Sequence, residues 1–278
     1  MGGLCIRRGR GVGSGAPPPA DGSALRAAVG AWLVGAEAAV CAAIDAAFPT
    51  DVILDITRAG IDLSRLRPRS ILQTGSDANG DPTPAQLASL SPRWSVHICG
   101  MVLPHQRDIV RALAQRVALV TLDAPCHTGA NKSHADDVLA LATSCDAFLP
   151  SLKDLAGLWP GRPPRQLLRL IAERGVPAAV IRLGVGGSIG VQDGTITFMP
   201  AFPVTASGVT AGGDAYAGAF TAVFAGDRDL PKAMAWATAA ASAVVEAGGA
   251  LDPLNQFARS RVELRAGALL DEMQRVPI

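Results

Sequence analysis

The chain has 278 residues, of which 49% are hydrophobic, so it can bury a substantial core as one large domain, with or without a small appendage. It carries 25 basic and 24 acidic side chains, which gives no indication of a polyanion-binding surface or of a surface matched to anionic lipid. We therefore expect neither a nucleic-acid partner nor a membrane partner. The five cysteines are odd in number and scattered, which favours a reducing compartment and predicts a cytoplasmic protein.

The first 20 residues differ in composition from the rest of the chain. They are rich in Gly, Arg and Pro, end in Pro17-Pro18-Pro19, and show neither strand alternation nor helical periodicity. They are predicted to form a disordered or poorly ordered arm. From Asp21 onward, apolar residues at helical spacing follow Ser23, a residue type favoured at helix N-caps. Residues 21–278 are therefore predicted to form one α/β domain.

Short apolar runs alternate with helical stretches through the middle of this domain. The predicted strands are Val96–Met101, Val117–Leu122, Ala147–Leu149 and Ala178–Leu183, and helices are predicted to start near Gln106, Ser133 and Pro164. This order is typical of a parallel sheet covered by helices on both faces. A hairpin turned at Asp193-Gly194 follows, and the chain then continues in the predicted helices Gly212–Phe224, Pro231–Val245 and Arg261–Met273. Ligands of such sheets bind at the carboxyl ends of the strands.

The segment Gly208–Phe220, with the sequence GVTAGGDAYAGAF, carries the clearest chemical signal. Small residues at a helix start leave backbone N–H groups uncovered, and the positive end of the helix attracts phosphate oxygens. We therefore expect a site for phosphate oxygens at this helix start. Asp214 would lie beside it, where its carboxylate could accept the proton of an attacking hydroxyl. The alternative is that the glycines make a tight turn and Asp214 only caps the helix.

This segment resembles the C-terminal signature of the ribokinase-like (PfkB-type) carbohydrate kinase family, commonly Asp-Thr-x-Gly-Ala-Gly-Asp followed by a small residue, an aromatic and Gly-Phe. The matching residues are Thr210, Gly213, Asp214, Tyr216, Gly218 and Phe220, while Gly208 replaces the leading Asp. The resemblance extends from Asp21 to Leu251. It implies a ribokinase-like three-layer α/β/α sandwich with a mostly parallel central sheet. It also implies that Asp214 is the catalytic base and that residues 211–213 form the anion hole.

The stretch Asp21-Gly22-Ser23-Ala24-Leu25-Arg26 occupies the place of the family's sugar-contacting Gly-Gly-x-x-x-Asn motif. Its second Gly is retained as Gly22, and Arg26 stands where the family has Asn. The resemblance implies that Gly22, Ser23 and Arg26 lie on the substrate side. Arg26 could bind an acidic or phosphorylated substrate through a bidentate contact. The alternative is a solvent-facing helix residue.

The segment Phe148–Asp154 looks like the family's strand that ends in Pro-Asn-x-x-Glu, whose polar residues help to organise Mg²⁺ and phosphate. Ser151 and Asp154 are shortened versions of that polar pair. The resemblance therefore implies that both residues belong to the ATP site and that Asp154 has an indirect role at the metal.

The segment Val180–Ser188 resembles the nucleotide-side pattern Val-x-Lys-x-Gly-x-x-Gly. Arg182 replaces the Lys, and Gly184 and Gly187 are in register. Together with Thr210 of the signature, these residues imply a nucleotide-binding side, although a Gly-rich turn after a strand is on its own more often just a turn.

The chain also departs from the family pattern at its start. Family members place a sugar-binding Asp on a first strand, together with part of a β lid, and only the Gly/Pro/Arg-rich arm stands there in this chain. We therefore expect both to be absent or replaced, as in an N-terminally truncated or divergent member; a start codon further upstream is another explanation. The segment Ser70–Asp81 is where a reduced lid is expected. Gly208 puts in doubt any monovalent-cation site.

Two functions are consistent with these residues. The first is ATP-dependent phosphorylation of a sugar or nucleoside hydroxyl, with ATP and Mg²⁺ as cofactors. The alternative is a catalytically inactive ribokinase-like protein that binds nucleotide or sugar in a regulatory role, which the changed substrate and Mg²⁺ motifs suggest. Relatives often pair through their lid strands, so a homodimer is a further expectation.

Overall fold

The structure is a computed structural model that describes residues 2–7, 22–44, 48–68, 82–125, 132–205, 212–248 and 251–278. The predicted lid segment Ser70–Asp81 lies outside these residues, as do Thr210 and Ala211 of the predicted site.

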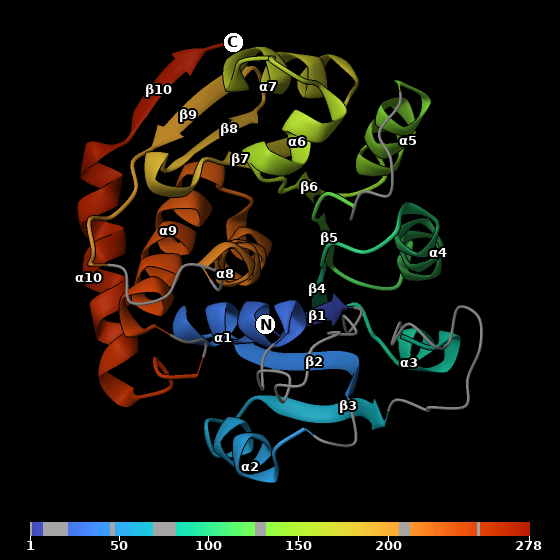
Figure 1. The fold of residues 1–278 in the computed structure, drawn as a ribbon, viewed down its shortest axis with the longest axis vertical. Helices are drawn as coiled ribbons and strands as arrows, with labels where there is room; N and C mark the ends of the chain where they lie inside the picture. The colour runs from blue at the N-terminus through green and yellow to red at the C-terminus, as the bar shows by residue number, and fades with distance from the viewer. Residues whose placement is uncertain are drawn as a thin grey trace, which may run out of the picture.

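A ten-stranded sheet runs through the molecule in the order β10-β9-β8-β7-β6-β5-β4-β1-β2-β3 (Figure 1). Its strands are β1 (Gly2–Arg7), β2 (Glu37–Ile44), β3 (Asp62–Pro68), β4 (Trp94–Ile98), β5 (Leu119–Leu122), β6 (Ala147–Phe148), β7 (Ala178–Arg182), β8 (Ser188–Gln192), β9 (Thr195–Met199) and β10 (Gln274–Pro277). The pairs from β3 through β7 are parallel, and the pairs from β7 to β10 are antiparallel. The sheet is therefore mostly parallel, as predicted.

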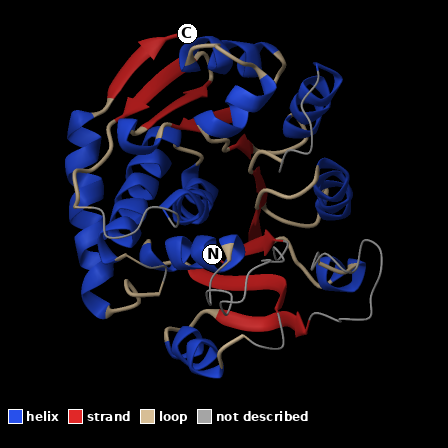
Figure 2. Cartoon of the chain, viewed as in Figure 1, coloured by secondary structure: helices blue, strands red, loops and turns tan. Residues whose placement is uncertain are grey.

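Helices cover both faces of the sheet (Figure 2). One layer contains α1 (Ser23–Leu33), α8 (Gly212–Asp227), α9 (Leu230–Ala247) and α10 (Gln256–Glu272), and the other contains α3 (Pro84–Ala88), α4 (Leu103–Leu113), α5 (Lys132–Ala142), α6 (Leu152–Leu158) and α7 (Pro164–Glu173). A separate hydrophobic core lies between the sheet and each layer. Helix α2 (Thr50–Arg58) joins the first core through the buried Ile56. This arrangement is the predicted three-layer α/β/α sandwich.

Strand β1 corrects the prediction of a poorly ordered arm. Gly2–Arg7 lies inside the sheet, parallel to β2 on one side and to β4 on the other, with Leu4 opposite both Ala39 and Val96. The first strand is therefore present, although its sequence, GGLCIR, contains no Asp. This strand forms because it pairs with two strands that are distant in sequence. The local sequence, which continues in Arg, Gly and Pro residues, contains no signal of that pairing. The rest of the predicted arm, residues 8–20, lies outside the described part of the chain.

The predicted hairpin is confirmed. Strands β8 and β9 are joined at Asp193 and Gly194, whose φ angles of 47° and 70° are those of a two-residue type I′ turn. Within the described ranges, no helix combines the length and apolar character needed to cross a membrane.

Candidate active site

The N-terminus of α8 forms the centre of the candidate site. Gly212, Gly213 and Asp214 make up its first turn, with Asp214 as the acidic residue there. A Cβ at Gly212 would lie 2.8 Å from Val245 Cγ2, so glycine is needed for α8 to pack against α9. A Cβ at Gly213 would lie 3.3 Å from Arg182 Nη1. The glycines therefore let the positive end of α8, which attracts anions, pack close to α9 and Arg182.

Helix α1 brings Arg26 to Asp214. Arg26 Nε donates to Asp214 Oδ2 at 2.7 Å, and the two side chains are only 15% and 17% exposed. The helices cross closely because a Cβ at Gly30 would overlap the carbonyl of Ala215, and a Cβ at Gly218 would overlap that of Ala27. Each glycine lies one turn beyond a member of the ion pair. The close helix crossing thus brings the predicted substrate side and the predicted base together.

The other predicted substrate-side residues lie in the same turn of α1. Gly22 is the N-cap of α1 and makes no side-chain cap, and its carbonyl accepts from the Arg26 N–H at 2.9 Å. Ser23 Oγ accepts from Arg26 Nη2 at 3.4 Å. Arg26 therefore does not point into solvent, and the alternative reading of this residue is wrong.

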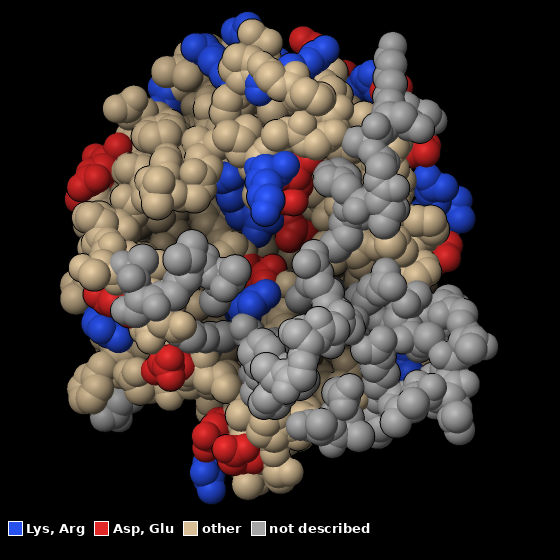
Figure 3. Space-filling model, viewed as in Figure 1, with Lys and Arg blue, Asp and Glu red and all other residues tan. Residues whose placement is uncertain are grey.

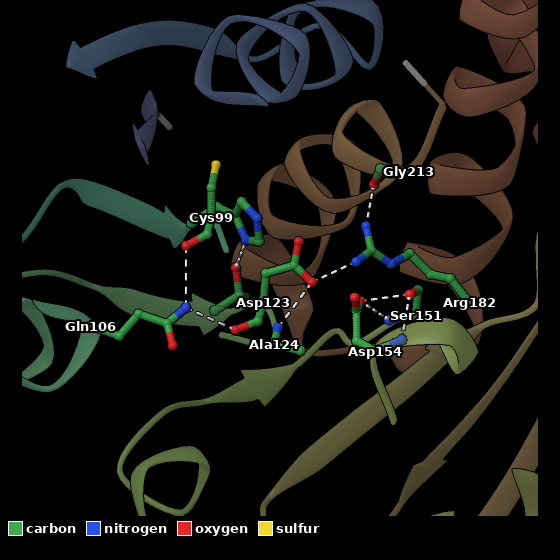
Figure 4. A network of polar contacts seen from close by, with 10 residues as sticks. Cys99, Gln106, Asp123, Ala124, Ser151, Asp154, Arg182 and Gly213 are labelled. Carbon is green, nitrogen blue, oxygen red and sulfur yellow. Dashed lines mark hydrogen bonds and ion pairs between the residues drawn. The ribbon is translucent and has the colours of Figure 1, made fainter. Parts of the chain in front are cut away.

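Arg182, the last residue of β7, connects two parts of the site (Figure 4). Its Nη1 donates to the carbonyl oxygen of Gly213 and its Nη2 to Asp123 Oδ1, both at 2.5 Å. The side chains of Arg182 and Asp123 are 11% and 9% exposed. Arg182 Nε is buried and has no hydrogen-bond partner among the described residues. The guanidinium thus links the start of α8 to the end of β5.

Asp123 lies at the same edge of the sheet, and the sequence left it outside the residues assigned to the site. It directly follows β5, its Oδ1 accepts from the Ala124 N–H at 3.1 Å, and its carbonyl accepts from Gln106 Nε2 at 3.0 Å. Burial raises the pKa of Asp123 to about 7; the Arg182 guanidinium opposes this rise, and the carboxylates of Asp154 and Asp214 add to it. Its place after a buried parallel strand is the sequence signal that allows a binding role for it.

Ser151 and Asp154 form a capping box at the start of α6. Ser151 Oγ accepts from the Asp154 N–H at 3.1 Å, and Asp154 Oδ2 accepts from the Ser151 N–H at 3.1 Å and from the Ser151 hydroxyl at 2.5 Å. A bridge between Ser151 and Arg182 places the pair beside the end of β7. Both residues thus lie at the same edge of the sheet as Asp123, with a structural role already evident.

Gly184 and Gly187 shape the turn between β7 and β8. Their φ angles are 62° and 84°, in the region that favours glycine, and a Cβ at Gly187 would overlap the carbonyl of Met199. The turn is closed by a hydrogen bond of 2.8 Å from the Leu183 N–H to the Gly187 carbonyl. The turn geometry alone accounts for both glycines.

Basic and acidic side chains lie side by side in a hollow near the centre of one face of the molecule (Figure 3). The described residues contain no group of three His, Cys, Asp or Glu side chains that could hold a metal ion. A metal at this site would therefore need ligands besides these side chains.

A buried polar chain connects the sheet to α8. His97 Nδ1 lies 2.9 Å from Thr121 Oγ1, which lies 2.6 Å from Thr221 Oγ1 on α8. Burial lowers the pKa of His97 to about 3, and the ring is therefore neutral at physiological pH. This chain helps to fix α8 on strands β4 and β5.

The sandwich, with helix N-termini and charged side chains at the carboxyl edge of its sheet, defines a ribokinase-like protein. It is similar to a fructokinase from Vibrio cholerae O395, solved with fructose, ADP and calcium ion (TM-score 0.73, 16% identity, 97% of this chain and 99% of that chain). It is also similar to an aminoimidazole riboside kinase from Salmonella enterica, solved with aminoimidazole riboside and an ATP analog (TM-score 0.71, 16% identity, 96% of this chain and 100% of that chain). A third similar structure is a ribokinase II from E. coli with ATP and Mg²⁺ (TM-score 0.69, 14% identity, 96% of this chain and 99% of that chain).

These identities establish the likeness of fold alone, and no curated protein sequence matches the chain. The family model for pfkB family carbohydrate kinases matches residues 58–256. The chain therefore belongs to the pfkB family of carbohydrate kinases. The matched range includes Asp123, Arg182 and Asp214, whereas Arg26 precedes it.

Proposed function

We propose that this protein catalyses ATP-dependent phosphorylation of a hydroxyl group on a sugar or nucleoside, with Asp214 as general base. The observation that carries the proposal is the position of Asp214 in the first turn of α8, directly after Gly212 and Gly213. There the carboxylate adjoins a helix N-terminus that attracts phosphate oxygens. Family membership and the sugar and nucleoside kinases with the same fold support the reaction class.

The residues fit a bound nucleotide. Arg182 Nε is buried without a partner in the described part of the chain and would be satisfied by a phosphate oxygen. The Gly212 and Gly213 N–H groups would form the described part of the anion hole, to which Ala211 would add, and Thr210 would contact the nucleotide. Gly184 and Gly187 would border the nucleotide through their turn. Mg²⁺ usually binds substrate phosphates and waters with one or two carboxylates, so the absence of an all-protein cage among the described residues is consistent with it.

In this proposal, ATP with Mg²⁺ supplies the phosphoryl group and neutralises part of its charge. Asp214 takes the proton of the acceptor hydroxyl as its oxygen attacks the γ-phosphorus. Arg182 and the α8 amides stabilise the charge that develops on the phosphoryl oxygens. Ser151 and Asp154 would orient the metal's water shell from the start of α6, and Gly22, Ser23 and Arg26 would contact the acceptor.

The test is ADP release by the purified protein with Mg-ATP across a panel of sugars and nucleosides, wild type beside Asp214→Asn. We expect turnover with at least one acceptor and a loss of about 100-fold or more in the variant. Asp271→Asn, which alters an exposed residue of α10, is the matched control and should retain full turnover. Unchanged turnover in Asp214→Asn would overturn the role of this residue.

A catalytically inactive protein that binds nucleotide or sugar in a regulatory role is the second candidate. The ion pair between Arg26 and Asp214 favours this candidate. At position 26 the family resemblance leads us to expect a neutral Asn, and here a cation is bonded to the proposed base instead. Stabilisation of the fold by ATP or a sugar, measured as a rise in Tm without ADP release, would support this candidate. Sustained ADP production that depends on Asp214 would exclude it.

A further inference from the structure

The Arg26–Asp214 ion pair engages one carboxylate oxygen of the proposed base. Asp214 Oδ2 accepts from Arg26 Nε at 2.7 Å, and a carboxylate oxygen engaged in this way is a poor acceptor for the proton of a substrate hydroxyl. Both side chains are largely withdrawn from solvent, so their attraction is stronger than that of a surface pair. Release of Asp214 therefore requires that an interaction of similar strength with the guanidinium replace this ion pair.

An anion is the partner that matches Arg26. A guanidinium presents five N–H donors in a planar fork that fits phosphate or carboxylate oxygens, whereas a neutral hydroxyl offers no charge to replace that of Asp214. The helix that carries Arg26 also presents its positive end here. The first turn of α1 contains no acidic residue, and its N-cap, Gly22, makes no side-chain cap, so the positive end of the helix is not neutralised from within.

Strand β1 reaches the same edge of the sheet. It ends at Arg7, and the carboxyl ends of parallel strands form the ligand-binding edge. The family resemblance leads us to expect an Asp on this strand and an Asn at position 26. The chain thus differs from the expected residues at two places associated with the sugar. Arg26 stands in place of Asn, and the first strand lacks the Asp and ends in Arg.

We propose that Arg26 makes the base available preferentially to acceptors that carry an anionic group in addition to the reacting hydroxyl, such as sugar phosphates or sugar acids. This inference rests on the proposed kinase function. The anionic group draws the Arg26 guanidinium away, and Asp214 Oδ2 then takes the hydroxyl proton. The acceptor oxygen forms its bond to the γ-phosphorus as the bond from that phosphorus to the β–γ bridging oxygen breaks, and ADP leaves. Arg26 is thus the specificity-determining residue of the site.

The experiment compares kcat/KM for matched neutral and anionic acceptors: fructose with fructose 6-phosphate, ribose with ribose 5-phosphate, and glucose with gluconate. Wild type should prefer an anionic member by about 10- to 100-fold, the range expected for one charge-assisted contact. Arg26→Asn should bring this ratio close to one by lowering turnover of the anionic acceptor and raising that of the neutral one. Arg26→Lys, which retains the charge without the fork, should give an intermediate ratio.

Arg111→Asn, at an exposed arginine of α4, is the matched control and should keep the wild-type ratio. Equal use of neutral and anionic acceptors by wild type would overturn the inference, and so would an undiminished preference in Arg26→Asn. Either result, with turnover still dependent on Asp214, would leave the proposed kinase function intact. No ADP release with any acceptor would overturn both. If Arg26→Asn fails to fold, the ratio for Arg26→Lys decides, and a wild-type ratio there would contradict the inference.

Discussion

Arg182 on β7 and Asp123 after β5 form an ion pair across the intervening strand β6, with Arg182 Nη2 2.5 Å from Asp123 Oδ1. The same guanidinium donates a hydrogen bond to the carbonyl oxygen of Gly213 at the start of α8. The carboxyl ends of two strands and the N-terminus of the helix that carries Asp214 are therefore connected through one buried side chain. This connection positions the proposed base independently of any ligand.

The pH dependence of stability should change when Arg182 is removed. Burial raises the pKa of Asp123 to about 7, so this group's contribution to folding stability is fully present below its unfolded pKa of about 4 and is lost as the pH rises to about 7. Arg182→Gln removes the guanidinium that opposes the rise, and the loss should then continue above pH 7. Urea unfolding of the variant should show a stability that keeps falling above about pH 7, by up to about 1.4 kcal/mol per pH unit relative to wild type.

Two controls isolate this effect. Adding Asp123→Asn to Arg182→Gln should remove the additional slope, because no titrating carboxyl then remains at this position. Arg174→Gln breaks an exposed pair with Asp136, whose side chains are 47% and 49% exposed, and should show no additional slope. Parallel pH profiles for wild type and Arg182→Gln would contradict the coupling between Arg182 and Asp123.

The crossing of α1 and α8 should tolerate no added methyl group. A Cβ at Gly218 would overlap the carbonyl of Ala27, so Gly218→Ala must push the two helices apart. We expect a loss of about 1–3 kcal/mol in the free energy of unfolding, measured by urea denaturation. Gly226→Ala, further along α8 with nothing within 4 Å of its added Cβ, should instead be neutral or stabilising by up to about 1 kcal/mol. Equal effects of the two substitutions would contradict the close crossing.

Local patterns predicted the elements with strong signals of their own. The Asp193-Gly194 turn and the start of α8 at Gly212 were located correctly, because glycine-rich turns and helix starts leave short-range signatures. Helix α4 begins at Leu103 instead of near Gln106, because Pro104 is well suited to the first turn of a helix. This boundary differs because the proline signal for a helix start was overlooked.

Long-range pairing explains what the sequence did not predict. Strands β1 and β2 have weak patterns of their own: β2, EAAVCAAI, is rich in alanine and is a strand because β1 and β3 flank it. Arg26 was predicted to lie on the substrate side, but its bond to Asp214 depends on a helix crossing between residues 188 positions apart. The Arg182–Asp123 pair depends in the same way on the order of the strands in the sheet.

The only tyrosine of the chain should not ionise in the folded protein. Tyr216 is buried, its hydroxyl lies 3.0 Å from Ser188 Oγ, and burial raises its pKa above the ordinary value. Absorbance of phenolate near about 295 nm should stay absent in the native state at about pH 11, where a free tyrosine with a pKa of about 10 is mostly ionised. In urea the same titration should occur near about pH 10. A native titration at the ordinary pKa would show that Tyr216 is accessible to water.

Substitutions at the two glycines that begin α8 should separate function from stability. A Cβ at Gly213 would lie 3.3 Å from Arg182 Nη1, at the end of a long side chain, whereas a Cβ at Gly212 would lie 2.8 Å from Val245 Cγ2 in the α8–α9 contact. Gly212→Ala should therefore lower the free energy of unfolding by about 1–3 kcal/mol. Gly213→Ala should change it by less than about 1 kcal/mol, since alanine favours the helix.

The effect of Gly213→Ala should appear in phosphoryl transfer. The added methyl group displaces the guanidinium of Arg182 from the start of α8 by a few tenths of an ångström, and misplaced catalytic groups lower the rate steeply. On the proposed function, we expect kcat to fall about tenfold with the fold intact, measured as ADP release beside a urea unfolding curve. A variant with wild-type kcat would show that Arg182 does not act on the transferred group. A variant with wild-type stability and a reduced kcat would connect the Arg182–Gly213 contact to the reaction and not to folding.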